Sequence, residues 1–118
     1  MAISTDIQFV EGETRGRVAT LRVRGRLDAD TAQLLLQRCA EIQASGQNLI
    51  LNLSEVSFLG STGVGALLAL VEQFQEQAGV VRFACLSEAA RTVVDVLDLG
   101  DYLSIHASEQ DALAAMEA

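Results

Sequence analysis

The sequence predicts one α/β domain, built on a mixed β-sheet that begins with an antiparallel hairpin and carries helices on both faces. Its 118 residues, 50% apolar and 20% charged, suit one compact core and exclude a two-domain enzyme. Two strand-like segments open the chain. After them, helical and strand patterns alternate, as they do when right-handed crossovers join parallel strands. Residues 1–118 are therefore expected to form a single domain.

The N-terminal segments have the two-residue period of β-strands. Ile3, Ile7 and Phe9 share one face, and after a loop over residues 11–16 apolar and polar side chains alternate along residues 19–24. This pattern predicts an antiparallel hairpin with one face exposed to water.

An amphipathic helix is expected next. Asp28 and Asp30 are candidate caps, apolar side chains recur at helical spacing from Leu34 to Ile42, and Gly46 is typical of the residue just beyond a helix end. The strand over residues 48–53 that follows has consecutive apolar residues at 49–51, which predicts a central strand covered on both faces.

The remaining elements complete the order ββαβαβαβα, with about four helices. The segments expected are a loop from Ser54 to Gly60, a helix from Ser61 to Ala78, a strand from Val80 to Cys85, a helix capped by Ser87 and ending near Gly100, a strand from Tyr102 to Ile105, and a last helix opened by a capping box of Ser108 and Asp111.

The charge balance excludes some classes of partner. Sixteen acidic residues oppose eight arginines, and the net charge of −8 repels nucleic acids and anionic membranes. Five of the arginines lie between residues 15 and 26, where they are expected to solvate a strand edge and to bind no ligand. Neither a signal peptide nor a membrane-spanning segment is recognisable, so the cytoplasm is the expected compartment.

The residues that most often support catalysis are sparse. Cys39, Cys85 and the single histidine, His106, are far apart in sequence and lack the spacing of a metal site or a Ser-His-Asp relay. We therefore expect no metal, no cofactor and no enzyme activity.

The segment from Ser57 to Gly65 is the richest candidate site, because it joins the central strand to a helix. One interpretation is purely structural, with Ser61 as a helix cap and Gly63 and Gly65 allowing close packing. A dinucleotide site is disfavoured, since the glycines read G-x-x-G-x-G and seven residues separate Leu53, the end of the predicted strand, from Ser61. A hydrolase elbow is disfavoured as well, because G-x-S-x-G needs a residue between Gly60 and Ser61.

Two motifs point to a third interpretation. Gly25-Arg26-Leu27-Asp28 matches a G-x-L-D turn, and Gly60-Ser61-Thr62-Gly63-Val64-Gly65 matches the hallmark D-S-[ST]-G-x-G at all but its first position. With these motifs, nearly the whole chain resembles the STAS domain of bacterial anti-sigma factor antagonists.

The resemblance implies a STAS-like fold and a non-enzymatic adaptor. In that family the adaptor sequesters an anti-sigma factor, itself an ATP-dependent serine kinase, and so frees a sigma factor. The first hydroxyl residue of the hallmark is the phosphoacceptor, which here is Ser61, with Thr62 as its rival. Partner binding then falls on a small set of residues: Asp28, Thr31, Gly60, Ser61, Thr62 and Gly63. A serine phosphatase resets the switch, and the free adaptor is expected to be a monomer or weak dimer.

One departure from the family motif concerns the phosphorylation step. Gly60 stands where the family has Asp, an acid that can steer the kinase and hold the acceptor hydroxyl. The alternative function is therefore that of related STAS modules that work unphosphorylated, as accessory subunits of lipid-transport ABC complexes or as scaffolds in stress-signalling assemblies.

Overall fold

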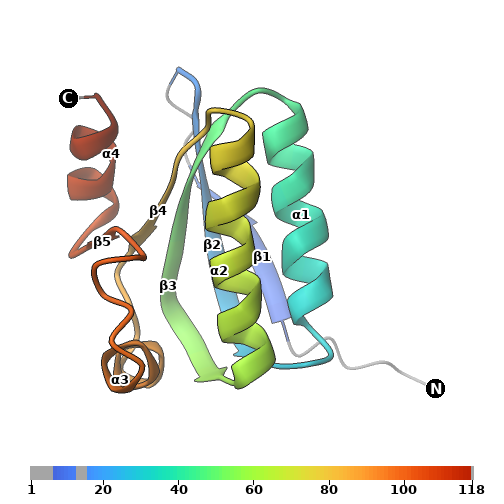
Figure 1. The fold of residues 1–118 in the computed structure, drawn as a ribbon, viewed down its shortest axis with the longest axis vertical. Coiled ribbons are helices and arrows are strands. Elements are labelled where there is room, and N and C mark those ends of the chain that lie inside the picture. The colour runs from blue at the N-terminus through green and yellow to red at the C-terminus, as the bar shows by residue number, and fades with distance from the viewer. Residues whose placement is uncertain (1–6, 13–15, 118) are drawn as a thin grey trace.

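The computed structural model describes residues 7–12 and 16–117, which form one five-stranded sheet and four helices (Figure 1). The strands are β1 (Ile7–Glu11), β2 (Val18–Leu27), β3 (Asn48–Leu59), β4 (Val81–Ala84) and β5 (Ile105–His106). The helices are α1 (Ala32–Ala44), α2 (Ser61–Glu76), α3 (Glu88–Val96) and α4 (Glu109–Glu117). The predicted element order is confirmed. The predicted position of Ile3 lies outside the described residues.

The sheet is mixed, as predicted, with strand order β1-β2-β3-β4-β5. β1 pairs antiparallel with β2, and the other three pairings are parallel. The apolar run of β3 is buried on both faces, and β3 lies at the centre of the sheet. No helix in the described ranges is long and apolar enough to cross a bilayer.

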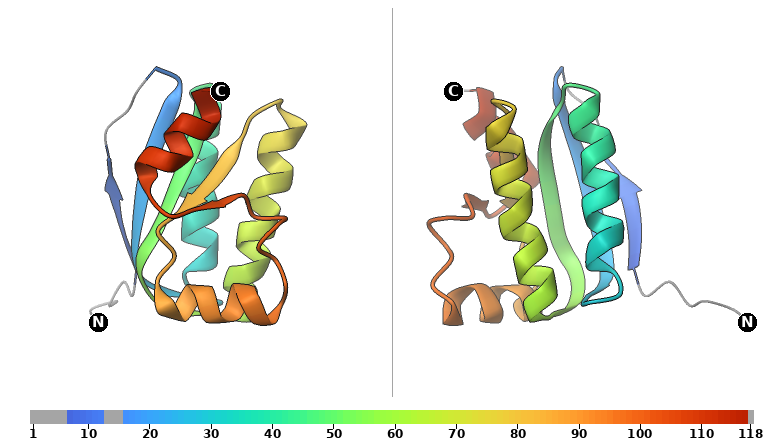
Figure 2. Two further views of the ribbon diagram at one scale, coloured as in Figure 1. Left: turned by 90° about the vertical axis from the view of Figure 1, so that its left-hand side faces the viewer. Right: turned by 45° about the vertical axis from the view of Figure 1, so that its right-hand side comes forward.

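The two faces of the sheet carry different layers. Side chains of β2, β3 and β4 pack with α1 and α2 in the main core, of which Leu21, Leu51 and Phe83 are fully buried members. α3 adds Ala90 and Val94 to that core. α4 lies on the opposite face (Figure 2), over a small cluster of Ile50, Ala84 and Ala112. Helices therefore cover both faces, as predicted.

Residues 54–59 do not form the predicted loop. They continue β3, which pairs with β2 as far as Leu59 opposite Leu27. Two register shifts interrupt the pairing: Arg22 faces Asn52 but Arg24 faces Glu55, and Gly25 faces Val56 but Arg26 faces Phe58. Each shift inserts one extra residue into β3 as a bulge, which breaks the two-residue period that identifies a strand in sequence.

Other boundaries shift by a few residues. Residues 101–104 form turns, and the last strand is confined to Ile105–His106. α3 ends at Val96 and α2 at Glu76, each earlier than predicted. The cap of α4 agrees with the prediction, because the Asp111 N–H donates to Ser108 Oγ at 3.0 Å.

The arginines of β2 do not protect a sheet edge, because β2 lies between β1 and β3. Instead they form ion pairs on the face opposite the main core. The pairs are Arg22 with Glu109, Arg24 with Glu55, and Arg26 with Asp28.

Candidate functional site

The predicted site residues lie in two turns at one end of the sheet. Because β2 and β3 are parallel neighbours, they end side by side, and the Gly60 N–H donates to the Leu27 carbonyl at 2.9 Å. The turn after β2 carries Asp28, and the helix after β3 starts at Ser61. The structure therefore brings together segments that are more than 30 positions apart in the sequence.

The Asp28 turn is held by its own hydrogen bonds. Asp28 Oδ1 accepts from the backbone N–H groups of Asp30 at 3.0 Å and Thr31 at 3.2 Å. The residue that caps α1 is Thr31, whose hydroxyl donates to the Arg26 carbonyl at 2.5 Å and accepts from the Asp28 N–H at 3.0 Å. Thr31 is 4% exposed. It therefore stabilises the turn and offers little surface to a partner.

Asp28 carries a negative charge that its surroundings stabilise. Burial opposes ionisation, but the N–H groups of Asp30 and Thr31, the Thr31 hydroxyl and Arg26 together lower the pKa of the carboxyl below its ordinary value. Arg26 Nε lies 3.4 Å from Oδ2. Asp28 is half-buried, so part of this charge faces solvent at the end of the sheet.

Ser61 and Thr62 are exposed at the first two positions of α2. The interpretation in which Ser61 caps the helix is wrong, because Gly60 is the N-cap. Gly60 is extended, with φ −90° and ψ 176°, and its carbonyl accepts the first helical bond from the Val64 N–H at 2.9 Å. The Ser61 hydroxyl makes no hydrogen bond to another described residue. It is therefore available to a partner, beside first-turn N–H groups that carry partial positive charge.

Gly63 allows the start of α2 to lie close to the end of β2. A Cβ at this position would lie 2.5 Å from the Leu27 carbonyl oxygen and 3.0 Å from Leu59 Cδ1. Only glycine permits this approach, so Gly63 positions Ser61 and Thr62 from beneath. Gly63 is buried and contributes to the site through the backbone.

Phe58 and Arg26 also belong to this end of the sheet, although neither was among the predicted binding residues. Phe58 is 40% exposed, and the Arg26 guanidinium carbon lies 4.3 Å from the centre of its ring, in cation–π geometry. A Cβ at Gly60 would lie 3.0 Å from Phe58 Cε2. The Phe58 ring therefore lies close to where a side chain at position 60 would begin. The available signal was a phenylalanine two residues before the motif, to which the predicted loop gave no role.

An apolar groove of about 290 Å³ starts at Thr62 and runs between α1 and α2. Small side chains line it, since it is formed by Ala29, Ala32, Gln33, Leu36, Thr62, Gly65, Ala66 and Ala69. The groove extends the polar turns into a surface that could receive an apolar side chain of a partner protein.

Known proteins are similar to this chain in both sequence and architecture. The profile of the STAS domain matches residues 10–112. The anti-sigma-B factor antagonist of Bacillus subtilis is 26% identical over 110 residues, 93% of this chain and 96% of its own length. The crystal structure of an anti-sigma factor antagonist from Mycobacterium paratuberculosis superposes with a TM-score of 0.84 at 27% identity, over 98% of each chain.

The fold is also that of the Bacillus protein SpoIIAA, which has been solved in two forms. The unphosphorylated form has a TM-score of 0.77 at 21% identity, over 93% of this chain and 96% of that one. The phosphorylated form has a TM-score of 0.70 at 22% identity, over 92% and 99%. With a family profile covering most of its length, and turns that carry the family's motifs at one end of the family's sheet, this chain belongs to the STAS domain family.

Proposed function

We propose that the chain is an anti-sigma factor antagonist, an adaptor that binds an anti-sigma factor serine kinase and is released when Ser61 is phosphorylated. The relatives named anti-sigma factor antagonists, from Bacillus subtilis and Mycobacterium, support the general role. The docking surface consists of the Asp28 turn, the start of α2 and the adjoining α1–α2 groove. ATP is bound by the kinase, and a serine phosphatase restores the docking form.

The observation that carries this proposal is the exposed Ser61 hydroxyl at the start of a 16-residue helix. A phosphoryl group there meets the first-turn N–H groups and the positive end of the helix dipole, so the fold tolerates it. It also adds nearly two negative charges beside Asp28. A partner that docks on the unmodified surface then meets repulsion and a desolvation cost, and it dissociates.

Phosphorylation is tested by incubating the chain with its anti-sigma factor kinase and ATP, followed by intact-mass and fragment spectra. We expect one adduct of about 80 Da, the mass of a phosphoryl group, on Ser61. Ser61→Ala abolishes the adduct and keeps docking, whereas Thr62→Ala keeps the adduct and serves as the matched control. An adduct mapped to Thr62 would reassign the acceptor.

The contribution of Asp28 is tested with two variants that differ in one property. Asp28→Asn retains an oxygen that accepts the turn N–H groups but removes the charge, whereas Asp28→Ala removes both. If the kinase recognises the negative charge of Asp28, both variants bind it more weakly in calorimetric titrations. Asp28→Asn nevertheless keeps the melting temperature of the wild type. Unchanged affinity for Asp28→Asn would restrict Asp28 to holding the turn.

Gly60 supports a second candidate, an adaptor that works unphosphorylated as a scaffold or accessory subunit. The family's acid is missing at this position, and a Cβ there would lie 3.0 Å from Phe58 Cε2. The Gly60→Asp variant separates the two candidates. If phosphorylation of Ser61 is native but slow, restoring the acid accelerates it. If the native chain and the Gly60→Asp variant both bind the partner tightly and neither is ever modified, the scaffold is favoured.

A further inference from the structure

A second hollow lies far from the Ser61 surface, between α4 and the open face of the sheet. Its volume is about 210 Å³, and β2, β3 and α4 all contribute to its lining. In Figure 1, α4 lies on the other face of the sheet from α1 and α2, and away from the end at which α2 begins. A molecule bound under α4 would therefore leave the Asp28 and Ser61 turns accessible.

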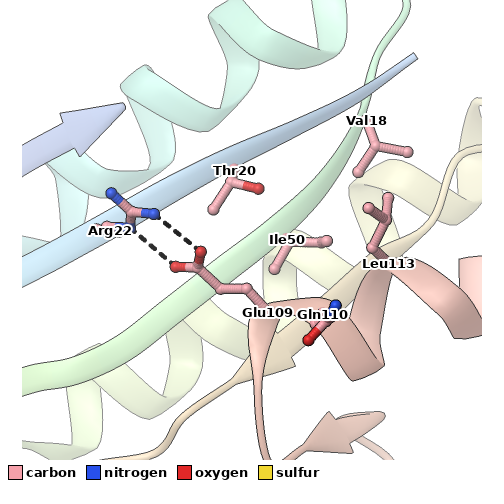
Figure 3. A pocket seen from close by; sticks show the side chains of 7 residues that line it. All are labelled: Val18, Thr20, Arg22, Ile50, Glu109, Gln110 and Leu113. Carbon is pink, nitrogen blue, oxygen red and sulfur yellow. Dashed lines mark hydrogen bonds and ion pairs between the residues drawn. The ribbon is translucent and has the colours of Figure 1, made fainter. Parts of the chain in front are cut away.

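The floor and one wall of the cavity are apolar. Val18 of β2, Ile50 of β3 and Leu113 of α4 present branched aliphatic side chains to it (Figure 3). An apolar cavity of about 150 Å³ holds a benzene ring. The cavity under α4 is therefore large enough for one ring that carries a small polar substituent.

The Thr20 hydroxyl faces this cavity. Thr20 is 8% exposed, and its Cγ2 methyl lies 3.1 Å from the Cβ position of Gly12, so the methyl is directed toward β1. Figure 3 shows the Thr20 oxygen on the side where Ile50 and Leu113 lie. The Thr20 oxygen is not among the buried side-chain polar atoms that lack a partner in the described residues. As a hydroxyl it both donates and accepts hydrogen bonds, so it is able to bond the head group of a ligand.

The charged residues at the rim neutralise each other. Glu109 accepts two hydrogen bonds from Arg22, from Nε and Nη2 at 2.9 Å each, and a third from Asn52 Nδ2 at 2.5 Å. Neither charge is left over to bind an ion. The Gln110 amide, also at the rim, offers both a donor and an acceptor.

We infer that this cavity is a binding site for a small neutral molecule, made of one ring and an amide-like or hydroxyl head group. The ring packs on Val18, Ile50 and Leu113, and the head group bonds Thr20 and Gln110. Neutrality follows from the closed Arg22–Glu109 pair, which leaves no free charge of either sign at the rim to bind an ion. This inference is independent of the function proposed for the Ser61 surface.

The test uses three probes of nearly identical shape: benzamide, benzoate and benzamidine. Each is titrated into the ¹⁵N-labelled full chain, and amide shifts are followed by NMR. We expect benzamide to give saturable shifts centred on Thr20, Ile50 and Leu113, with a Kd on the order of 1 mM for so small a ligand. The two charged probes bind at least several-fold more weakly. Absence of saturable benzamide shifts at these residues, or tighter binding of either ion, would overturn the inference.

Two variants locate the site. Thr20→Val removes the hydroxyl at nearly constant volume and weakens benzamide binding about fivefold, as expected for one neutral hydrogen bond. Leu113→Phe fills the cavity and abolishes binding. Leu97→Phe makes the same change at a half-exposed position at the end of α3 and leaves the affinity unchanged. Benzamide binding that survives both Thr20→Val and Leu113→Phe unchanged would place the probe elsewhere and refute the site.

Discussion

The two faces of the sheet are held by different physical interactions. On one face, α1 and α2 cover a continuous apolar core whose central side chains are fully buried. On the other, Ala112 of α4 packs against Ile50 and Ala84, and the rest of the interface is an Arg22–Glu109 ion pair and a hollow. Apolar burial supplies most of the free energy of folding, whereas ion pairs near the surface contribute little. The α1–α2 face therefore dominates stability, and the α4 face is able to open locally.

Each face of the sheet has one cysteine, and the rates at which the two thiols are chemically modified should show the largest difference between the faces. Cys39 of α1 is fully buried in the main core, and burial raises the pKa of its thiol to about 12. Cys85 is partly buried against the α4 cluster. Because Cys39 is reached only by global unfolding, which costs about 5–15 kcal/mol, iodoacetamide should modify Cys85 at least about a thousandfold faster.

Peptide mapping by mass spectrometry over a time course measures both labelling rates in one sample. The control is the same reaction in concentrated urea, where the two thiols should react at similar rates. Native labelling of Cys39 that keeps pace with Cys85 would mean that the main core opens as readily as the α4 face.

Shortening a leucine on each face compares their packing directly. Leu51→Ala in the main core should lower the free energy of unfolding by about 2–5 kcal/mol, because it removes fully buried methyl groups and leaves a cavity. Leu113→Ala should cost about 1 kcal/mol, since Leu113 is only partly buried and already borders a hollow. Urea denaturation measures both, and equal losses would contradict the comparison.

Within the α1–α2 face, two glycines of α2 should respond in opposite directions. Gly63→Ala forces a Cβ against the Leu27 carbonyl and should destabilise by about 1–3 kcal/mol. Gly65→Ala, whose Cβ would meet nothing within 4 Å, should stabilise the helix by about 0.5–1 kcal/mol. The melting temperatures of the two variants distinguish the cost of the close backbone approach at Gly63 from the effect of helix propensity at Gly65. A neutral Gly63→Ala would show that α2 can shift outward.

The smallest expected effect is the pH dependence of the α4 ion pair. The hydrogen bond from Arg22 lowers the pKa of Glu109 below its ordinary value, despite some burial. The resulting stability is present above the ordinary carboxyl pKa of about 4.5 and is lost as pH falls through the lower folded value. Glu109→Gln should therefore reduce stability by about 0.5–1 kcal/mol at pH 7, and the difference from wild type should shrink below pH 4.5.

A matched variant checks that this effect depends on position. The Arg24–Glu55 pair is about half exposed on both sides. Glu55→Gln should change the stability at pH 7 by less than Glu109→Gln does. If both variants lose the same stability, the α4 interface does not strengthen its ion pair.

The element order was predictable because most helices and strands of this chain keep a regular apolar period. The end of β3 was not predictable, because two bulges, at Ser54 and Ser57, interrupt the alternation of buried and exposed side chains. The first is supported by a side chain, since Asn52 Oδ1 accepts the Ser54 N–H at 2.8 Å while Nδ2 bonds Glu109 of α4. The contact with Glu109 joins residues 57 positions apart and has no local signal in the sequence.

The placement of the two motifs side by side was predictable, but their detailed structure was not. The parallel strands that precede Asp28 and Ser61 followed from the alternation of elements, and parallel neighbours end at the same edge of the sheet. The burial of Thr31, the cap at Gly60 and the Phe58 ring beside it depend on backbone angles and neighbouring strands. Those are tertiary properties, and a one-residue shift at a helix start is enough to change which hydroxyl is bound and which is available.

The contact between Gly63 and Leu27 limits how a group attached to Ser61 could affect the surface at this end of the sheet. With a Cβ excluded at 2.5 Å, α2 has no room to slide or tilt toward β2 when a group is attached to Ser61. The backbone at this end of the sheet therefore stays in place, and the surface property that can vary is the electrostatic potential. If Ser61 is phosphorylated as proposed, this potential changes without any rearrangement of the chain, and it acts on an approaching protein within a screening length of about 8–10 Å.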